Sequence, residues 1–263
     1  MTQMQPKYDK IGIHYNQTRK ADTYLASRLL HHLNPNESGH YLDIGCGTGN
    51  YTDALQRRGF QFVGIDPSNE MLANAKLRNP KIDWQIGSAE KTGLEENSID
   101  GIIACLTIHH WPDLELAFTE LNRLLKPKRR LVIFTSTPKQ MKGYWLNHYF
   151  PEMLKDSMSQ MPAFEKVEKA MNSSGFEIAQ TERYSVKQDL QDQFLYCGKE
   201  KPEVYLDDKV RNGISSFSSL ANKREVEQGL TELRKDMDSG KIEEVQASYE
   251  NHHGDYLYII GRS

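Results

Sequence analysis

The sequence has few cysteines and no long apolar run, and these absences exclude several classes of protein. Its 263 residues include only three cysteines, Cys46, Cys105 and Cys197, and no CxxC pair. We therefore expect reduced thiols, no disulfide framework and no metal site. The longest apolar run, around residues 102–106, is far shorter than the roughly 18 to 20 residues of a membrane-spanning helix. We expect no membrane span.

The chain also lacks an excess of either charge. Its 33 Lys and Arg residues nearly balance its 36 Asp and Glu residues, so its overall field would not attract a polyanion. A nucleic-acid partner is therefore not expected. The first ten residues have no apolar segment behind a basic start, so we expect no signal or transit peptide and a cytoplasmic location. Nothing in the composition indicates an oligomeric state.

From residue 40 onward, short apolar segments alternate with amphipathic helical segments. This alternation predicts a doubly wound α/β fold with a mostly parallel sheet. The strand-like segments are residues 41–45, 60–66, 82–86, 98–106 and 129–136. The segments with the spacing of a helix that has one apolar face are residues 50–58, 69–78 and 114–125.

The remaining segments lie at the two ends of this pattern. Apolar residues at helical spacing over 8–33 predict two helices, broken near residues 16–18. Residues 138–159, which are rich in aromatics and methionines, are interpreted as irregular. After them we expect a helix at 163–173, a strand at 176–186, a polar and mostly helical segment at 188–249, and a strand at 255–263. The simplest account is one domain, residues 1–263, with an N-terminal helical lid (1–35) and helical insertions (137–160 and 188–250) that form a substrate cap.

The strongest motif is the glycine-rich segment DIGCGTGN at residues 43–50, between a predicted strand and a predicted helix. Its alternate glycines allow a sharp turn and a close approach of backbone to ligand. Asp66 ends the next strand about 20 residues further on, where a carboxylate can accept both hydroxyls of a ribose. The GxGxG spacing differs from the GxGxxG of dinucleotide sites, and Asp43 would repel a pyrophosphate but suits an ammonium group. An adenosine cofactor with a methionine part is predicted.

With four further segments, this loop resembles the class I S-adenosylmethionine-dependent methyltransferases, specifically the small-molecule group with an LD-[IVL]-GCGTG motif. The further segments are GIDPSNEML (64–72), GSAEKTGLEENSIDGI (87–102), LTIHHWPD (106–113) and ELNRLLKPKRRLVIF (120–134). The resemblance covers about residues 8–136 and extends loosely to the end of the chain. It implies a Rossmann-like seven-stranded sheet of order 3-2-1-4-5-7-6 with strand 7 antiparallel, and S-adenosylmethionine as cofactor. The long segment 188–249 departs from the family pattern.

The resemblance also assigns residues to the cofactor. It implies that Gly45, Cys46 and Gly47 line the methionine part and that Asp66 holds the ribose. The N-terminal segment resembles the family's helix over the cofactor, which would bring Tyr15 and Arg19 to the methionine end. There Arg19 would pair with the carboxylate and Tyr15 would face the substrate. The remaining implied contacts are Pro67, Ser68 and Met71 beside the adenine, Ser88, Ala89 and Glu90 at its edge, and Leu106 near the sulfonium.

Methyl transfer is an in-line displacement at a carbon that a sulfonium group already activates, so a protein mainly aligns the reacting atoms. If the acceptor must lose a proton, His109 and His110 are the candidates for a general base. Both follow the fourth strand at its carboxyl end, where open α/β sheets place ligands. The alternative is that this pair supports its loop through hydrogen bonds to the backbone.

Aromatic residues of the first insertion are candidates for the acceptor site, because small-molecule pockets are lined mainly by apolar and aromatic side chains. These residues are Tyr144, Trp145, His148 and Tyr149. The alternative is that they form the core of a small helical cap.

The favoured function is methyl transfer to a small-molecule acceptor. A methyltransferase acting on RNA or protein would predict a basic face in the insertions, where acidic residues instead offset the lysines. If the chain were a non-catalytic cofactor-binding module, its cofactor loop would be expected to have lost the motif residues. If it were a nicotinamide oxidoreductase, the loop would be expected to have the GxGxxG spacing.

Overall fold

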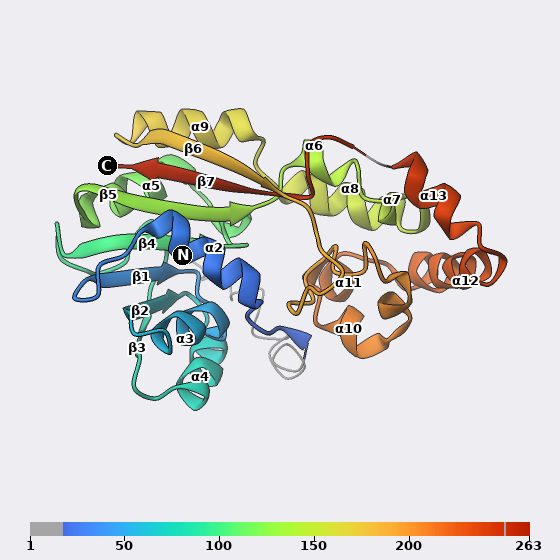
Figure 1. The fold of residues 1–263 in the computed structure, drawn as a ribbon, viewed down its shortest axis with the longest axis horizontal. Coiled ribbons are helices and arrows are strands. Elements are labelled where there is room, and N and C mark those ends of the chain that lie inside the picture. The colour runs from blue at the N-terminus through green and yellow to red at the C-terminus, as the bar shows by residue number, and fades with distance from the viewer. Residues whose placement is uncertain (1–17, 250) are drawn as a thin grey trace, which may run out of the picture.

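The computed structural model describes residues 18–249 and 251–263, which form a seven-stranded sheet with helices on both faces (Figure 1). The strands are β1 (His40–Ile44), β2 (Gln61–Asp66), β3 (Asp83–Ile86), β4 (Ile99–Cys105), β5 (Leu125–Thr135), β6 (Glu177–Tyr184) and β7 (Tyr256–Arg262). Their order is β3-β2-β1-β4-β5-β7-β6. The pairs among β1 to β5 are parallel, and β7 runs antiparallel to both β5 and β6. The predicted fold class, strand order and direction are confirmed.

Five helices pack against this sheet: α2 (Thr23–Leu33), α3 (Asn50–Gln56), α4 (Asn69–Arg78), α5 (Leu114–Leu124) and α9 (Phe164–Ser173). Side chains of successive strand residues point to opposite faces. Ile102 of β4 therefore packs in a core with α5 and α9, whereas Ile103 packs in a core with α2 and α3. Three of these helices begin at a side chain that accepts from a backbone N–H of the first turn, namely Asp22, Ser68 and Asp113.

The first insertion follows β5 and contains α6 (Pro138–Met141), α7 (Leu146–Tyr149) and α8 (Pro151–Gln160). The expectation of an irregular segment over 138–159 is wrong. Pro138 and Pro151 begin helices, because the first turn of a helix does not use the N–H that proline lacks. Thr137 and Gln140 form a capping box that fixes the start of α6.

The second insertion lies between β6 and β7. It holds η3 (Pro202–Leu206), α10 (Asp208–Asn212), α11 (Ser215–Ser219), α12 (Lys223–Ser239) and α13 (Ile242–Ser248). Its first part, residues 185–201, is an extended and turning segment without a helix, so the predicted helical region begins later than residue 188. Helices α6–α8 and α10–α13 gather beyond the end of β5, on the right of Figure 1. Together they are called the cap lobe.

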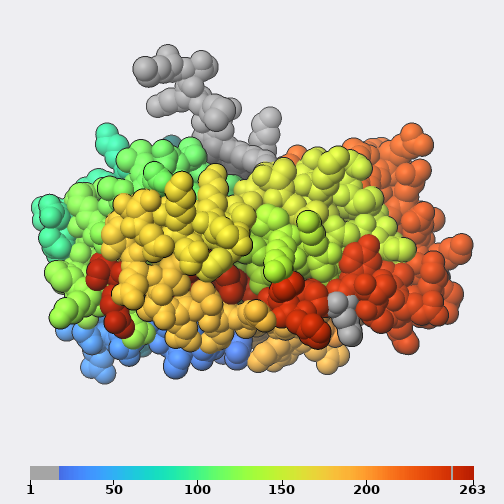
Figure 2. All heavy atoms as spheres, turned by 90° about the horizontal axis from the view of Figure 1, so that it is seen from above, coloured from blue at the N-terminus to red at the C-terminus, as the bar shows by residue number. Residues whose placement is uncertain are grey.

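The two insertions pack directly against each other in the cap lobe. In Figure 2 the yellow-green first insertion lies beside the orange second insertion. Ser157 of α8 donates a hydrogen bond to Ser216 of α11 at 2.8 Å, and both serines are buried. Of the two predicted N-terminal helices, the second is α2, and the first lies outside the described residues. Among residues 18–249 and 251–263, no helix is both long and apolar enough to cross a membrane.

Candidate active site

The loop between β1 and α3 holds its three glycines in the left-handed region, with φ of +70° at Gly45, +55° at Gly47 and +73° at Gly49. A Cβ at Gly45 would lie 2.0 Å from Oγ1 of Thr107, and one at Gly49 would lie 2.3 Å from the ring of Trp84. These two glycines therefore allow close packing within the protein. A Cβ at Gly47 would meet no atom within 4 Å, so Gly47 faces open space that a ligand can enter.

Asp66, at the carboxyl end of β2, fastens this loop to the next one. Its Oδ2 accepts a hydrogen bond from the N–H of Gly47 at 2.9 Å, and its Oδ1 accepts one from the N–H of Ser68 at 2.9 Å. The side-chain oxygen of Ser68 accepts from the N–H of Met71 and so caps α4. A carboxylate offers about four lone-pair sites on its two oxygens, so Asp66 has the acceptor chemistry that a ligand hydroxyl requires.

A cavity of about 640 Å³ opens along this loop, and it is called the first cavity. The predicted cofactor residues that line it are Arg19, Asp43, Gly45, Cys46, Gly47, Asp66, Met71 and Leu106. The structure thus brings together residues that lie as far apart in the sequence as Arg19 and Leu106.

Five residues that the resemblance assigned to the adenine do not line the first cavity. Pro67 is exposed and Ser68 caps α4. The backbone of Ser88 pairs with Lys91, Ala89 is buried in the core with α5, and a carboxylate oxygen of Glu90 accepts from the N–H of Asp113 at 3.5 Å. Their contact with a cofactor stays a prediction.

Two side chains that line the first cavity, Asp43 and Asn50, carry buried acceptor oxygens. Asp43 is 2% exposed, and burial raises the pKa of its carboxyl to about 7. A 2.6 Å hydrogen bond from Oγ1 of Thr52 acts in the opposite direction on this pKa, and the nearby charge of Asp66 raises it further. Oδ1 of Asn50 is buried and has no hydrogen-bond partner among the described residues. Because buried polar atoms are normally hydrogen-bonded, both acceptors fit the ammonium group of a methionine moiety.

Arg19 lies at the junction of the N-terminal segment and the second insertion. Its Nε donates to Oδ1 of Asp192 at 2.5 Å, and its Nη2 donates to Oδ2 at 3.2 Å. The hydroxyl of Tyr51 donates to the same carboxylate at 3.1 Å. Arg19 therefore borders the first cavity as part of an ion pair, and its predicted contact with a cofactor carboxylate remains a prediction.

A second cavity, of about 780 Å³, adjoins the first. The two share three lining residues, Arg19, Leu106 and His110. The remaining lining comes from the carboxyl end of β5, the start of β7, residues 194–195 and the cap lobe, including Tyr144 of the first insertion and Ser157, Ser216 and Ile214. Leu106 stands between the cavities with φ of +53°, a strained conformation for a non-glycine residue, and its N–H donates to the carbonyl of Phe134 at 2.7 Å.

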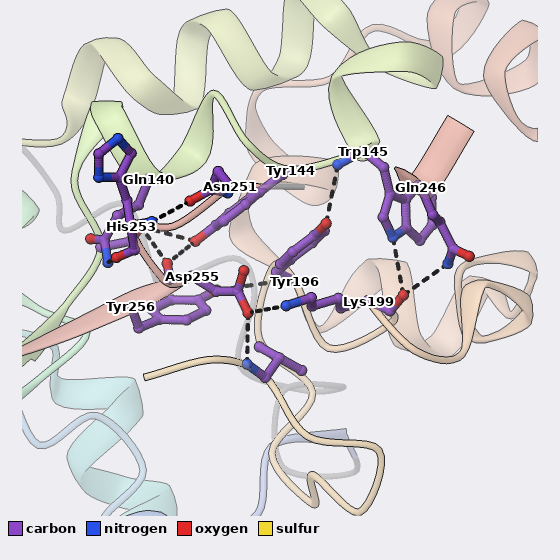
Figure 3. Close-up of polar contacts among 12 residues, drawn as sticks. Gln140, Tyr144, Trp145, Tyr196, Lys199, Gln246, Asn251, His253, Asp255 and Tyr256 are labelled. Atoms are coloured by element: carbon purple, nitrogen blue, oxygen red, sulfur yellow. Dashed lines mark hydrogen bonds and ion pairs between the residues drawn. The ribbon is translucent and has the colours of Figure 1, made fainter. Parts of the chain in front are cut away.

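Tyr144 is held as a wall of the second cavity by the polar network in Figure 3. Its hydroxyl donates to the carbonyl of Asp255 at 2.5 Å, and its ring stacks on Tyr196 with centroids 3.9 Å apart. The carboxylate of Asp255 accepts from Nζ of Lys199 and from the N–H of Val186. This network joins both insertions to the start of β7, so the position of the Tyr144 ring is fixed from three sides.

Three other residues predicted for the acceptor site, Trp145, His148 and Tyr149, do not line the second cavity. Nε1 of Trp145 donates to the carbonyl of Lys199 at 3.1 Å, and Tyr149 donates to Oδ2 of Asp236 at 3.0 Å. Trp145 and Tyr149 are buried in the cap lobe, whereas His148 is exposed. Tyr15 lies outside the described residues. The placement of Trp145 and Tyr149 corresponds to the core of the cap lobe.

His109 and His110 lie on η2 (Ile108–His110), directly after β4. Their rings are close, with centroids 3.9 Å apart, and the N–H of His110 donates to the carbonyl of Thr107. His109 lines only the second cavity, whereas His110 lines both. His110 therefore occupies the position where a group in one cavity would meet a group in the other.

The thiols near the site are not activated. Cys46 lines the first cavity, and so does Cys105, the last residue of β4. Burial raises the pKa of both thiols well above the ordinary value. Neutral thiols are poor nucleophiles and poor metal ligands. Within residues 18–249 and 251–263, no group of three or more His, Cys, Asp or Glu side chains could hold a metal ion.

Several residues of the two cavities were missed in the sequence. Asp192 follows β6 in a stretch without periodicity, and Ser157 and Ser216 lie on different short helices. None belongs to a motif, so no local signal could have identified them. Asn50 ends the glycine-rich segment and could have been inferred from its position directly after Gly49.

Comparisons with known proteins point to one family. A family described as "Methyltransferase domain" matches residues 42–133. Among solved structures, a protein described as a methyltransferase from an antibiotic biosynthesis pathway of Anabaena variabilis is 31% identical, with a TM-score of 0.83. The match covers 94% of this chain and 99% of that one.

Curated proteins match over a shorter part. An uncharacterized methyltransferase of Mycobacterium tuberculosis is 34% identical over 112 residues, which are 43% of this chain and 46% of that protein. The ubiquinone/menaquinone biosynthesis C-methyltransferase of Rubrivivax gelatinosus is 30% identical over 125 residues, 47% of this chain and 48% of that protein. The chain thus spans about half the length of the curated relatives it matches.

Proposed function

The chain belongs to the class I S-adenosylmethionine-dependent methyltransferases, and we propose that it transfers the methyl group of this cofactor to a small molecule. The observation that carries the proposal is the meeting of two cavities at Leu106 and His110. The cofactor occupies the first cavity and the acceptor the second. Two relatives support a small acceptor, since their names refer to antibiotic and to quinone biosynthesis.

In this proposal the chain holds the cofactor by groups suited to each of its parts. The open space at Gly47 admits the ligand against the backbone. Asp66 accepts hydrogen bonds from the ribose hydroxyls, and Asp43 and Asn50 accept from the ammonium group. The bound cofactor supplies a methyl group on a positively charged sulfur. Aligning that group with an acceptor contributes up to roughly 7–11 kcal/mol to lowering the barrier.

His110 is the proposed general base where the acceptor must lose a proton. It lines both cavities, whereas His109 borders only the second, so His110 is closer to the point of transfer. A well-placed base contributes about 10²- to 10⁴-fold to the rate. His109 supports this position through its close ring contact with His110.

The cap lobe supports a small acceptor over RNA or protein. Its two insertions meet at the Ser157–Ser216 hydrogen bond, and both serines also line the second cavity. The acceptor space is therefore bounded by both insertions. The remaining alternative is a non-catalytic cofactor-binding module. Such a module would bind the cofactor without transferring its methyl group, so an assay of methyl transfer distinguishes it from an enzyme.

Calorimetric titration with S-adenosylmethionine, and separately with NADH, tests the proposal. We expect S-adenosylmethionine to bind and NADH not to bind. In Asp66→Ala, affinity should fall about 100-fold, because two charge-assisted hydrogen bonds are lost. Asp83→Ala, which removes an exposed carboxylate at the start of β3, is the matched control and should bind normally. Absence of binding, or binding indifferent to Asp66, would refute the cofactor assignment. Binding without methyl transfer to any metabolite in a screen would favour the non-catalytic module.

A further inference from the structure

The described residues that line the second cavity carry almost no formal charge. Among residues 18–249 and 251–263, Arg19 is the only Lys, Arg, Asp or Glu in this lining. Its guanidinium is already bound by the carboxylate of Asp192 through two nitrogens. Among the described lining residues, an acceptor with a carboxylate or phosphate would therefore find no counter-ion of its own, and an ammonium would find no carboxylate. Since an unpaired charge is costly to bury, the cavity favours an uncharged molecule.

The same cavity is suited to flat rings. Tyr144, Phe194 and Tyr256 line it, and the ring of Phe194 meets that of Tyr256 edge to face with centroids 4.7 Å apart. Met141 and Met161 complete this apolar surface with flexible side chains that adapt to a ligand's outline. Aromatic walls favour aromatic ligands, because offset and edge-to-face ring contacts add to the burial of apolar area.

Hydrogen-bonding groups stand at two separate walls. On the cap lobe, Ser157 and Ser216 share one hydrogen bond, and Gln160 lies beside them in the lining. On the sheet side, His110 lies at the junction with the first cavity. A ligand with one polar group toward His110 and another toward the serines would satisfy both walls.

The identity of the acceptor atom follows from these limits. An aliphatic amine carries a positive charge at neutral pH, and a carboxylic acid carries a negative one. Both are disfavoured by the uncharged lining. Among neutral hydroxyls, a phenol has a pKa of about 10, only about 3.5 units above that of an ordinary imidazole. A histidine can therefore take the proton of a phenol far more readily than that of an aliphatic alcohol.

We propose that the acceptor is an uncharged phenol, bound in the second cavity with its hydroxyl beside His110. The inference rests on the proposed methyl transfer and adds the substrate class to it. The phenol oxygen forms a bond to the methyl carbon as the carbon–sulfur bond breaks, and the bonding pair stays on sulfur. The hydroxyl proton passes to a ring nitrogen of His110. The products are an aryl methyl ether and a neutral thioether.

Three probes with the same ring and different charge test this class: 2-naphthol, 2-naphthoate and 2-naphthylmethylammonium. Their binding to the full chain, saturated with S-adenosylhomocysteine, is measured by calorimetry. We expect 2-naphthol to bind at least about tenfold more tightly than either ion, because only the ions must lose hydration without gaining a partner. Equal or tighter binding of an ion, or no binding of 2-naphthol, would overturn the proposal.

A charge introduced into the lining provides a second measurement. Gln160→Lys places a cation in the second cavity and should improve 2-naphthoate binding about fivefold or more relative to 2-naphthol. Gln228→Lys, at an exposed glutamine of α12 that does not line this cavity, is the control and should leave the ratio unchanged. Leu220→Arg is an independent variant in the same lining. If both lining variants leave the ratio at the control value, the probes bind elsewhere and the proposal fails.

Titration with S-adenosylhomocysteine distinguishes failure of the phenol proposal from failure of the proposed methyl transfer. Binding of this product together with a preference for an ion would refute the phenol and leave methyl transfer intact. If S-adenosylhomocysteine did not bind, the proposed methyl transfer itself would be refuted, regardless of how the naphthyl probes bind.

Discussion

Arg19 and Asp192 lie 173 residues apart in the chain and form a two-point ion pair at the edge of the first cavity. The carboxylate also accepts the hydroxyl of Tyr51 from α3. One residue before it, the N–H of Gln191 donates to Asp22, the N-cap of α2, at 3.0 Å. These contacts fix the segment that follows β6 against the N-terminal helix and beside the cofactor loop.

Replacing Asp192 by Ala should destabilise the protein strongly. The change leaves the guanidinium of Arg19, only 13% exposed, without this carboxylate, and removes the acceptor of Tyr51. Breaking a buried ion pair by removing one partner costs about 3–5 kcal/mol. Urea unfolding followed by circular dichroism measures the change. Asp189→Ala, at an exposed residue of the same segment, should shift stability by less than about 0.5 kcal/mol. Equal effects of the two variants would show that the ion pair does not fix this segment.

Gly47→Ala should abolish cofactor binding while the protein still folds. Its Cβ would meet no protein atom within 4 Å, so the cost to folding is limited to the left-handed backbone, about 1–2 kcal/mol. The methyl group would instead occupy the space that the ligand needs. Gly93→Ala is a matched control, because Gly93 also has positive φ and open space but does not line the first cavity.

Thermal denaturation and titration with S-adenosylhomocysteine distinguish the two glycine variants. Both should lose similar stability, and only Gly47→Ala should lose affinity. Gly45→Ala should be the least stable of the three, because its Cβ would lie 2.0 Å from Oγ1 of Thr107. Normal affinity in Gly47→Ala would mean that the ligand does not approach this backbone.

The sheet and the cofactor loop could be predicted because their signals are local. Most of the strands in the parallel part are short apolar runs between turns, and residues 40–66 form one strand–helix–strand unit in which the spacing fixes the geometry. Helix α4 begins and ends at the predicted residues for the same reason, with Ser68 as its N-cap. The strand order came from the family resemblance, and the observed sheet has that order.

The acceptor side could not be predicted in the same way. Tyr144 lines the second cavity, whereas Nε1 of the adjacent Trp145 points to the carbonyl of Lys199 (Figure 3). The sequence shows that Tyr144 and Trp145 are both aromatic, but only their tertiary packing decides which of them lines the cavity. Asp192 shows the same limit, since its partners lie 141 and 173 residues away in the chain.

His110→Asn should slow methyl transfer to a phenolic acceptor by about 10²- to 10⁴-fold, because the amide cannot accept the hydroxyl proton. Affinity for S-adenosylhomocysteine should change by less than about twofold, since asparagine keeps a polar group of similar size. His109→Asn, at the neighbouring residue outside the first cavity, should have a much smaller effect on kcat. Steady-state rates with the acceptor found by screening decide between them. Equal losses in both variants would indicate that the pair acts only through the shape of its loop.

Cofactor affinity should depend on pH through Asp43. Burial raises the pKa of this carboxyl to about 7, so the apo protein binds a proton there at pH 6 that the unfolded chain has already lost. Folding stability from this group is therefore full below about pH 4 and declines as pH rises toward 7. A bound ammonium group favours the ionised carboxylate, so binding must release that proton.

Affinity for S-adenosylhomocysteine should accordingly fall roughly eightfold between pH 7.5 and pH 6, a range in which the ligand's ammonium group stays largely protonated. Calorimetry in buffers of different ionisation enthalpy should detect up to one proton released per ligand at pH 6. Asp43→Asn cannot ionise, so its affinity should be weaker at pH 7.5 and nearly constant over the same range. A wild-type affinity that does not change with pH would place the ammonium group away from Asp43, and it would favour Oδ1 of Asn50, which has no partner among the described residues, as its acceptor.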